Sequence, residues 1–445
     1  MKQINQTARS VCLRALLQME RDEGYSNIVL DKALAASMLS SRDKSLASTI
    51  FYGVLERRLT LDYFLRHCLR EPQKKPDRAA LAALRCGAYQ LLCLERVPDA
   101  AAVNETVAAL KLIGKPQLAG FVNGVLRGLL RKKETLLLPE DNTPASLSLR
   151  YSVPEGLIRL WQKGYGEAVS LKLLESFSER PQAYIRVNTT RCTAAELQAH
   201  MERQGVNLIC LSRPEGAAIL ENCGSPCELP EFHQGFFHVQ DLSAQLVCRL
   251  LEPQPGETVC DCCAAPGGKS FTLAQGVGAD GKVYAFDLHK DRVKLIEGGA
   301  KRLGLSMIET GVNDASQGFD VMPLVDKMLC DVPCSGFGVI RRKPEIRYRN
   351  LDEVKKLPAL QYAILAQAAK RVKPGGILVY STCTLNPAEN NRVAERFLKV
   401  NDGFRPMKID LGLEHCVDEP EHMLTMTPFS GGSDGFFAAA FQKER

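Results

Sequence analysis

The sequence predicts an α/β protein in three parts: an all-helical domain at residues 1–140, a linker and small α/β module at 141–238, and a Rossmann-like, doubly wound sheet at 239–445. Two observations lead to this prediction. Residues 5–135 carry apolar side chains at helical spacing nearly throughout. From residue 241 onward, short apolar runs alternate with helical stretches, which is typical of a parallel sheet covered by helices on both faces.

Each helix of the first domain follows from apolar spacing. An apolar stripe from Ala8 to Met19 recurs at every third or fourth residue and predicts the first helix. Boundaries are expected at Pro76 and Pro98, because proline cannot continue a helix that precedes it. Residues 134–150 are polar, carry two prolines and predict a linker. The remaining helices are expected at 25–36, 42–68, 78–95, 99–113 and 117–132.

Shorter patterns predict the elements of the other two parts. The small module shows a strand pattern at 183–187 and a helix pattern at 194–203. In the strand order 3-2-1-4-5, which is common in doubly wound sheets, the fourth and fifth strands are neighbours ~4.8 Å apart. The strands of the large sheet are expected at 257–263, 282–287, 306–310, 326–331, 376–382 and 436–441, and its helices at 241–251, 269–276, 289–303, 353–372 and 387–399.

Composition predicts a soluble, cytoplasmic protein without a membrane span. Of the 445 residues, 45% are hydrophobic and 24% are charged, and no apolar run reaches the roughly 18 residues that a span needs. The N-terminus lacks the uninterrupted apolar region of a signal peptide. The sixteen cysteines are irregularly spaced along a long chain, so we expect reduced thiols and neither disulfides nor a metal. We expect a monomer.

Positive charge is concentrated in the helical domain. Residues 1–140 hold 22 Lys and Arg against 14 Asp and Glu, whereas the remaining residues hold 35 against 37. A basic excess confined to one domain favours a surface that docks a polyanion. A solvated helical face explains the same charge equally well.

A glycine-rich turn follows the first strand of the predicted sheet. The segment at 263–269, CAAPGGK, opens a helix, and its paired glycines let a ligand approach free backbone N–H groups. It matches neither the dinucleotide fingerprint nor a Walker loop. Acidic residues end the second and fourth strands at Asp287 and Asp331, and Asp314 follows the third strand. Because acidic groups suit a positively charged sulfonium nucleoside, the pattern favours S-adenosylmethionine over a phosphate ligand.

Two cysteines stand at the ends of the predicted fourth and fifth strands. Cys334 follows one strand and Cys383 ends the other, so both are expected in one cleft beside the cofactor turn. Methylation of pyrimidine carbon 5 suits such thiols: a thiolate adds to carbon 6, and carbon 5 becomes nucleophilic enough to accept a methyl group. Asp331 could then bond the ring nitrogen and amine of cytosine. The other fourteen cysteines are interpreted as small buried hydrophobes.

A basic segment follows Cys334. Residues 340–349 contain five cations and a tyrosine, and such a cluster is typical of phosphate contacts in an RNA-binding protein. The base to be modified must be unstacked, so we expect a loop or flipped nucleotide as the target. The residues expected to contact RNA are Arg341, Arg342, Lys343 and Arg347.

Four segments of the C-terminal two thirds resemble RNA cytosine-5 methyltransferases of the NOL/NSUN type. They are VQDLSAQL at 239–246, CAAPGGK at 263–269, DVPCSGFGVIRRKPEIR at 331–347 and STCTLNPAEN at 381–390. The resemblance implies that Cys383 is the nucleophile and that Cys334 assists release, with Asp331 as the third catalytic residue. It also implies a cofactor site made of Cys263, Ala264, Ala265, Pro266, Gly267, Gly268, Lys269, Asp287, Arg292, Asp314 and Asp331.

The helical domain is similar to the antitermination factor NusB. The similarity rests on its Ala8-Arg9 start and on the segment FVNGVLR at 121–127. A NusB-like domain joined to this catalytic half implies a bacterial enzyme that methylates cytosine in 16S, small-subunit ribosomal RNA, with the NusB-like domain as an RNA-binding part.

Other functions fit parts of the same sequence. One is a cytosine-5 methyltransferase that acts on tRNA. Another is a NusB-like RNA-binding or antitermination module whose methylase half is inactive, but Cys383, Cys334 and Asp331 are all intact. A protein or small-molecule methylase is disfavoured by the paired thiols and the basic segment.

Overall fold

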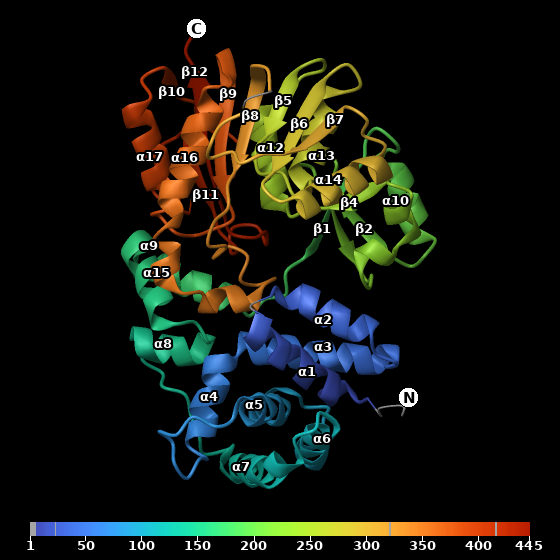
Figure 1. Ribbon diagram of the computed structural model, residues 1–445, viewed down its shortest axis with the longest axis vertical. Helices are drawn as coiled ribbons and strands as arrows, with labels where there is room; N and C mark the ends of the chain where they lie inside the picture. The colour runs from blue at the N-terminus through green and yellow to red at the C-terminus, as the bar shows by residue number, and fades with distance from the viewer. Residues whose placement is uncertain (1–5, 23, 320–321, 414–415) are drawn as a thin grey trace. The chain divides into compact units, whose positions relative to one another are not determined.

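The computed structural model describes residues 6–22, 24–319, 322–413 and 416–445 (Figure 1). The chain forms two compact units. One contains residues up to Leu160 together with Arg342–Tyr348, and the other contains Trp161–Arg341 and Arg349–Arg445.

The first unit is helical, as predicted (Figure 1). The expected helix at 42–68 is two helices, because the backbone leaves helical geometry at Arg57 (φ −115°, ψ 20°). The expected linker contains a helix, which begins at Pro144 with the Thr143 hydroxyl accepting from the Ser146 N–H. The elements are α1 (Ala8–Asp22), α2 (Ser26–Ala35), α3 (Ser41–Glu56), α4 (Arg58–Arg66), α5 (Arg78–Cys93), α6 (Asp99–Leu112), the 3-10 helix η1 (Pro116–Leu118), α7 (Ala119–Lys132), α8 (Pro144–Tyr151) and the 3-10 helix η3 (Pro344–Tyr348); α9 (Glu155–Ser176) contains the boundary between the units.

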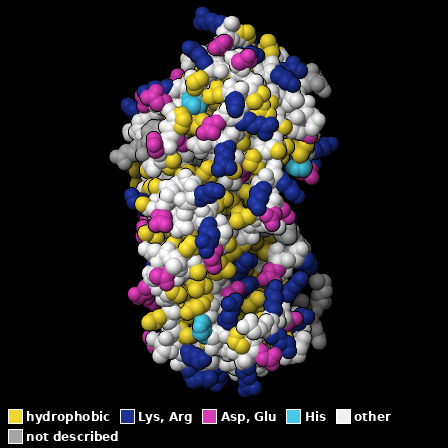
Figure 2. Space-filling model, turned by 90° about the vertical axis from the view of Figure 1, so that its left-hand side faces the viewer, with side chains coloured by type: hydrophobic (Ala, Val, Ile, Leu, Met, Phe, Trp, Pro, Cys, Tyr) yellow, Lys and Arg dark blue, Asp and Glu magenta, His cyan; other side chains and the backbone are white. Residues whose placement is uncertain are grey.

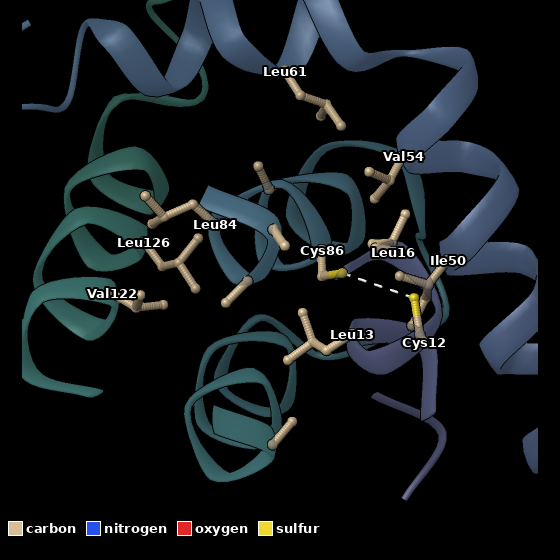
Figure 3. Packing of buried hydrophobic residues seen from close by; sticks show 14 of the residues in the cluster. Cys12, Leu13, Leu16, Ile50, Val54, Leu61, Leu84, Cys86, Val122 and Leu126 are labelled. Atoms are coloured by element: carbon tan, nitrogen blue, oxygen red, sulfur yellow. Dashed lines mark hydrogen bonds between the residues drawn. The ribbon is translucent and has the colours of Figure 1, made fainter. Parts of the chain in front are cut away.

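The core of the helical unit lies between α1, α3, α5 and α7 (Figure 3). Cys12 of α1 and Cys86 of α5 are fully buried there, with their Sγ atoms 3.8 Å apart. Burial raises the pKa of the Cys12 thiol well above its ordinary value, and the neighbouring Cys86 adds to the shift. At Gly87 a Cβ atom would lie 2.4 Å from Leu126 Cδ1, so glycine permits the close approach of α5 and α7. Lys and Arg side chains are spread over the face shown in Figure 2, with Asp and Glu side chains among them.

The second unit contains a small antiparallel sheet of order β2-β3-β1-β4, which follows α9 in the sequence. The predicted strand at 183–187 is β1, and the predicted helix at 194–203 is α10, which Thr193 and Glu196 start with reciprocal capping bonds. The elements are β1 (Ala183–Val187), α10 (Ala194–Glu202), β2 (Asn207–Cys210), β3 (Ala217–Glu221), the 3-10 helix η2 (Pro226–Glu228), α11 (Pro230–His233) and β4 (Phe237–Val239).

The large sheet has the order β10-β12-β9-β8-β5-β6-β7, with β11 paired to β12 (Figure 1). Its β7-β6-β5-β8-β9 part is parallel and confirms the predicted order 3-2-1-4-5. The last predicted strand, β12, instead runs antiparallel to β9, because β11 and β12 form a hairpin that returns the chain to the sheet. The elements are α12 (Leu242–Leu251), β5 (Thr258–Asp261), α13 (Gly268–Val277), β6 (Lys282–Asp287), α14 (Lys290–Leu303), β7 (Ile308–Val312), β8 (Val325–Asp331), α15 (Leu351–Val354), α16 (Leu357–Ala369), β9 (Val372–Thr382), α17 (Asn391–Val400), β10 (Phe404–Pro406), β11 (Met423–Met426) and β12 (Phe436–Lys443).

Buried apolar side chains cover both faces of this sheet in two clusters. Parallel strands bring their carboxyl ends to one edge, and here β5, β6 and β8 end in Asp261, Asp287 and Asp331. Among the residues that the structure describes, no cysteine forms a disulfide. In the part of the chain that the structure describes, no helix is long and apolar enough to cross a membrane, and no group of three or more metal-ligating side chains occurs.

Candidate active site

The cofactor turn connects β5 to α13. Gly267 adopts a φ of +111°, and a Cβ atom there would lie 2.3 Å from Cζ of the Phe271 ring, so this position requires glycine. The Gly267 N–H donates to the Ala264 carbonyl at 2.7 Å, and the Ala264 N–H donates to Phe286 on β6 at 2.7 Å. The turn is therefore held against the sheet, and the N-terminus of α13 is directed toward the carboxyl edge.

A buried carboxyl lies beneath this turn. Asp261, the last residue of β5, is 1% exposed and accepts a hydrogen bond from the Ser270 hydroxyl at 2.7 Å. Burial raises the pKa of Asp261 to about 7, and the nearby Asp331 carboxylate adds to the shift while Ser270 opposes it. Asp261 is thus a carboxyl group that can hold a proton near neutral pH.

Lys269 and Asp331 join the turn to the end of β8. Lys269 Nζ lies 2.6 Å from Asp331 Oδ2, and the Ser381 hydroxyl donates to Asp331 Oδ1 at 2.9 Å. Burial alone lowers the pKa of Lys269, but the Asp331 carboxylate outweighs it and the net shift is upward. Because Asp331 neutralises Lys269, this lysine is not arranged as a phosphate clamp.

The two thiols meet at the carboxyl ends of β8 and β9. Cys334 Sγ and Cys383 Sγ lie 3.2 Å apart, and both residues are half-buried. The contact with Cys383, burial and the nearby Glu389 and Asp331 carboxylates together raise the pKa of Cys334 well above its ordinary value. Cys334 therefore holds its proton at neutral pH and can donate it toward Cys383. The expectation that both thiols share one site agrees with this geometry.

Three of the other predicted cofactor residues, Asp287, Arg292 and Asp314, are engaged by neighbouring groups. Asp287 is 3% exposed and lies 3.2 Å from Arg292 Nη1, while Arg292 Nη2 donates to the Ala265 carbonyl at 2.7 Å. Asp314 is exposed, and its carboxylate accepts from the N–H and the hydroxyl of Ser316 within its own loop. Asp287 and Arg292 thus border the cofactor turn, whereas the role of Asp314 stays a prediction.

The predicted RNA contacts divide into two groups. Arg341 is 7% exposed and donates to the carbonyls of Gly432 and Ser433, and Arg347 is 3% exposed and donates to the Glu56 carbonyl at 2.8 Å. Guanidinium groups buried against main-chain carbonyls are not presented to phosphates, which argues against the predicted role of both.

Arg342 and Lys343, the other two predicted RNA contacts, are half-buried, and their role stays a prediction. Lys343 Nζ lies 4.5 Å from the centre of the Tyr25 ring within the helical unit. Residues 342–348 belong to the helical unit, although they are far from the rest of that unit in the sequence. Charge counting along the segment could not reveal it.

Sequence reasoning missed two residues beside the thiols. Arg349 is exposed and donates to the carbonyls of Cys334 and Ser335 at 3.2 and 2.9 Å. Glu389 is fully buried and bonds to the Ser335 side chain. The sequence signal for Glu389 was an acidic residue inside the segment 381–390, and that for Arg349 was its place at the end of the basic segment.

Family models match all three parts of the chain. A model described as 16S rRNA methyltransferase RsmB/F matches residues 248–442, the NusB family model matches 6–131, and an RsmF/B-like ferredoxin-like domain model matches 153–224.

Curated relatives match over nearly the full length. A protein of Bacillus subtilis (strain 168), named probable ribosomal RNA small subunit methyltransferase B, is 36% identical over 98% of this chain and 99% of its own. A Vibrio cholerae protein named ribosomal RNA small subunit methyltransferase B is 33% identical over 98% of this chain and 97% of its own.

Solved structures share the fold. The crystal structure of PH0851 covers 99% of both chains with a TM-score of 0.85 at 24% identity, which shows a common fold. A methyltransferase homologue from Pyrococcus horikoshii is 27% identical, with a TM-score of 0.60 over 68% of this chain and 99% of its own.

Proposed function

Because the chain belongs to the ribosomal RNA small subunit methyltransferase B family, we propose that it methylates carbon 5 of a cytosine in 16S ribosomal RNA through a covalent cysteine adduct. S-adenosylmethionine is its methyl donor, as the family implies. The observation that carries the proposal is the 3.2 Å contact between Cys334 and Cys383 beside the Lys269–Asp331 ion pair.

The residues at the sheet edge fit this cofactor. The Gly267 turn allows close approach of a ligand to the start of α13, and Asp287 lies at the end of β6, where this architecture binds a ribose. Lys269 is neutralised by Asp331, so the site suits a ligand without phosphate. When bound, S-adenosylmethionine supplies the methyl group.

We propose that Cys383 attacks carbon 6 of cytosine as a thiolate. The new S–C6 bond moves the electron pair of the 5,6 double bond to carbon 5, which then accepts the methyl group. Asp331 would accept a hydrogen bond from the exocyclic amine of the base, and one from its ring nitrogen once that nitrogen carries a proton, and these bonds would replace part of its contact with Lys269.

Release reverses the attack. The proton on carbon 5 leaves, its electron pair restores the double bond, and the S–C6 bond breaks to return Cys383 as a thiolate. We assign Cys334 to this step. Cys334 first loses its own proton to solvent, and its sulfur then accepts the proton from carbon 5. Its raised pKa makes the Cys334 thiolate a strong proton acceptor, and its sulfur lies 3.2 Å from that of Cys383, beside the adduct.

The substrate assignment is tested with the purified enzyme, S-adenosylmethionine and two RNAs from cells that lack the modification. We expect methyl transfer to small-subunit ribosomal RNA and none to tRNA. Methylation of tRNA alone would keep the chemistry and contradict the substrate. An enzyme that binds ribosomal RNA but methylates neither RNA would favour the alternative of an RNA-binding module.

We propose that the protein acts as a monomer, because Cys334, Cys383 and the Lys269–Asp331 ion pair all lie in one unit of one chain. An enzyme that methylates ribosomal RNA acts where small subunits are assembled, so we also propose that the protein acts in the cytoplasm. Sedimentation of the purified protein across a concentration series tests the first statement, and a concentration-dependent dimer would contradict it.

A further inference from the structure

A buried carboxylate joins the two loops that carry the thiols. Glu389 is 0% exposed and lies in the loop that follows Cys383. It accepts hydrogen bonds from the backbone N–H and the hydroxyl of Ser335 at 2.9 and 2.6 Å. It also accepts from the side-chain amides of Gln361 and Asn386 at 2.9 and 2.8 Å. We call Glu389 and these three partners the Glu389 network.

Every partner in the Glu389 network acts as a donor. An ionised carboxylate is an acceptor only, and two bonds at each oxygen match this donor set. In a glutamine at this position, the side-chain NH2 group would face at least one N–H donor and could not accept its hydrogen bond. The network therefore requires a carboxylate and not merely a polar side chain of this size.

The network reaches the residue directly after each thiol. Ser335 follows Cys334, Thr384 follows Cys383, and their hydroxyl oxygens lie 2.6 Å apart. The Phe337 N–H donates to the Thr384 hydroxyl at 3.3 Å. A chain of hydrogen bonds thus runs from one thiol loop to the other and ends at the carboxylate.

The other side of the Cys334 loop depends on the same network. The Gln361 amide that donates to Glu389 also donates to the Pro333 carbonyl at 3.0 Å. Pro333 and Ser335, the two neighbours of Cys334, are therefore both tied to Glu389 through hydrogen bonds. The carboxylate holds the backbone on both sides of one thiol.

We propose that Glu389 is a positioning residue for the release step, which holds Cys334 within reach of the Cys383 adduct. This inference rests on the proposed function. Glu389 acts on Cys334 through its hydrogen bonds with Ser335 and Gln361. Two of its four bonds go to Ser335, so its loss should displace Cys334 more than Cys383.

The test compares Glu389→Gln with Glu395→Gln in the full-length enzyme; Glu395 is an exposed glutamate on α17. Each variant is incubated with small-subunit ribosomal RNA and S-adenosylmethionine, and turnover and covalent adduct on a denaturing gel are measured. For Glu389→Gln we expect kcat to fall about 100-fold, because a misplaced group loses about this factor, with KM for RNA nearly unchanged. We also expect the adduct to accumulate although Cys334 is present. Glu395→Gln should behave as wild type.

Ser335→Ala keeps the backbone N–H bond and removes only the hydroxyl, so it should show the same accumulation at a smaller drop in kcat. It decides the outcome if Glu389→Gln does not fold, as judged by its melting temperature and cofactor binding. Wild-type turnover without accumulated adduct in the folded variants would overturn the inference. Cys334→Ala is run in parallel: if it forms no adduct, the proposed function itself fails and the assignment of Glu389 falls with it.

Discussion

The chain contains two close pairs of cysteines in very different surroundings. Cys12 and Cys86 lie in the core of the helical unit, fully buried among apolar side chains, with their Sγ atoms 3.8 Å apart. Cys334 and Cys383 are half-buried at the sheet edge, 3.2 Å apart, and the Glu389 network fixes their loops.

The causes of the raised thiol pKa values also differ between the pairs. For Cys12 the largest cause is burial, whereas for Cys334 it is the contact with Cys383, followed by burial and two carboxylates. Proximity of two thiols is therefore not a sign of chemistry by itself. Partial exposure and a polar support distinguish Cys334 and Cys383, the pair that we propose to be reactive, from the pair in the helical core.

The largest expected contrast is in activity. Cys383→Ala should abolish methyl transfer, because no covalent intermediate can form without the attacking sulfur. Cys86→Ala should retain turnover per folded molecule, since Cys86 lies in the core of the other unit. Initial rates on small-subunit ribosomal RNA measure both. Residual turnover by Cys383→Ala above background would contradict the assignment.

The two units also offer a comparison between ion pairs. Asp331→Asn should lower kcat/KM by about 100-fold, because the charge that pairs with Lys269 and faces the base is removed. Asp62→Asn breaks a similar pair in the helical unit, where Arg85 Nε lies 2.8 Å from Asp62 Oδ1. It should change melting temperature and not kcat/KM. Equal losses of kcat/KM in Asp331→Asn and Asp62→Asn would contradict the expected difference between the two ion pairs.

A pH series tests the buried carboxyl of the catalytic unit. The folded state raises the pKa of Asp261 to about 7, so the folded protein binds a proton that the unfolded chain has lost above about pH 4. The free energy of unfolding should therefore fall as pH rises from about 4 to 7, by ~4 kcal/mol at most.

Asp261→Asn should remove this pH dependence. Its free energy of unfolding, compared with that of wild type, should therefore be higher at pH 8 than at pH 5. Urea unfolding at both pH values measures it, with Asp402→Asn on the exposed surface as the matched control. The same pH dependence in Asp261→Asn and wild type would refute the assignment.

The smallest expected effect concerns the structural pair. Cys12→Ser places a hydroxyl in an apolar core and should destabilise the protein by about 1–3 kcal/mol, without changing kcat of the folded fraction. Cys210→Ser at an exposed site is the control and should be nearly neutral. Chemical denaturation distinguishes them, and a lowered kcat in folded Cys12→Ser would mean that the core pair contributes to activity.

Local patterns allowed much of the site to be predicted from the sequence. The turn at 263–269 depends on its own glycines, and the strand order follows from general rules of doubly wound sheets, so the meeting of Cys334 and Cys383 could be inferred. The NOL/NSUN resemblance supplied their separate roles, which the residues alone left open.

What could not be predicted depends on partners far along the chain. Arg347 bonds to Glu56, 291 residues away, and this burial overrides its charge as a guide to function. The role proposed for Glu389 could be inferred only from the structure, in which Ser335 and Gln361 both donate hydrogen bonds to its carboxylate. The direction of β12 likewise depends on its hairpin with β11.

The proposed mechanism assigns the attack on cytosine to Cys383 and the release of the product to Cys334. Cys334→Ala incubated with small-subunit ribosomal RNA and S-adenosylmethionine should trap a protein–RNA adduct, and mass spectrometry after nuclease and protease digestion locates the modified cysteine. We expect a methylated cytidine nucleotide on the peptide that carries Cys383, and no adduct in the Cys334→Ala/Cys383→Ala double variant. A nucleotide on any other cysteine, or a trapped adduct in Cys383→Ala attached through Cys334, would contradict it.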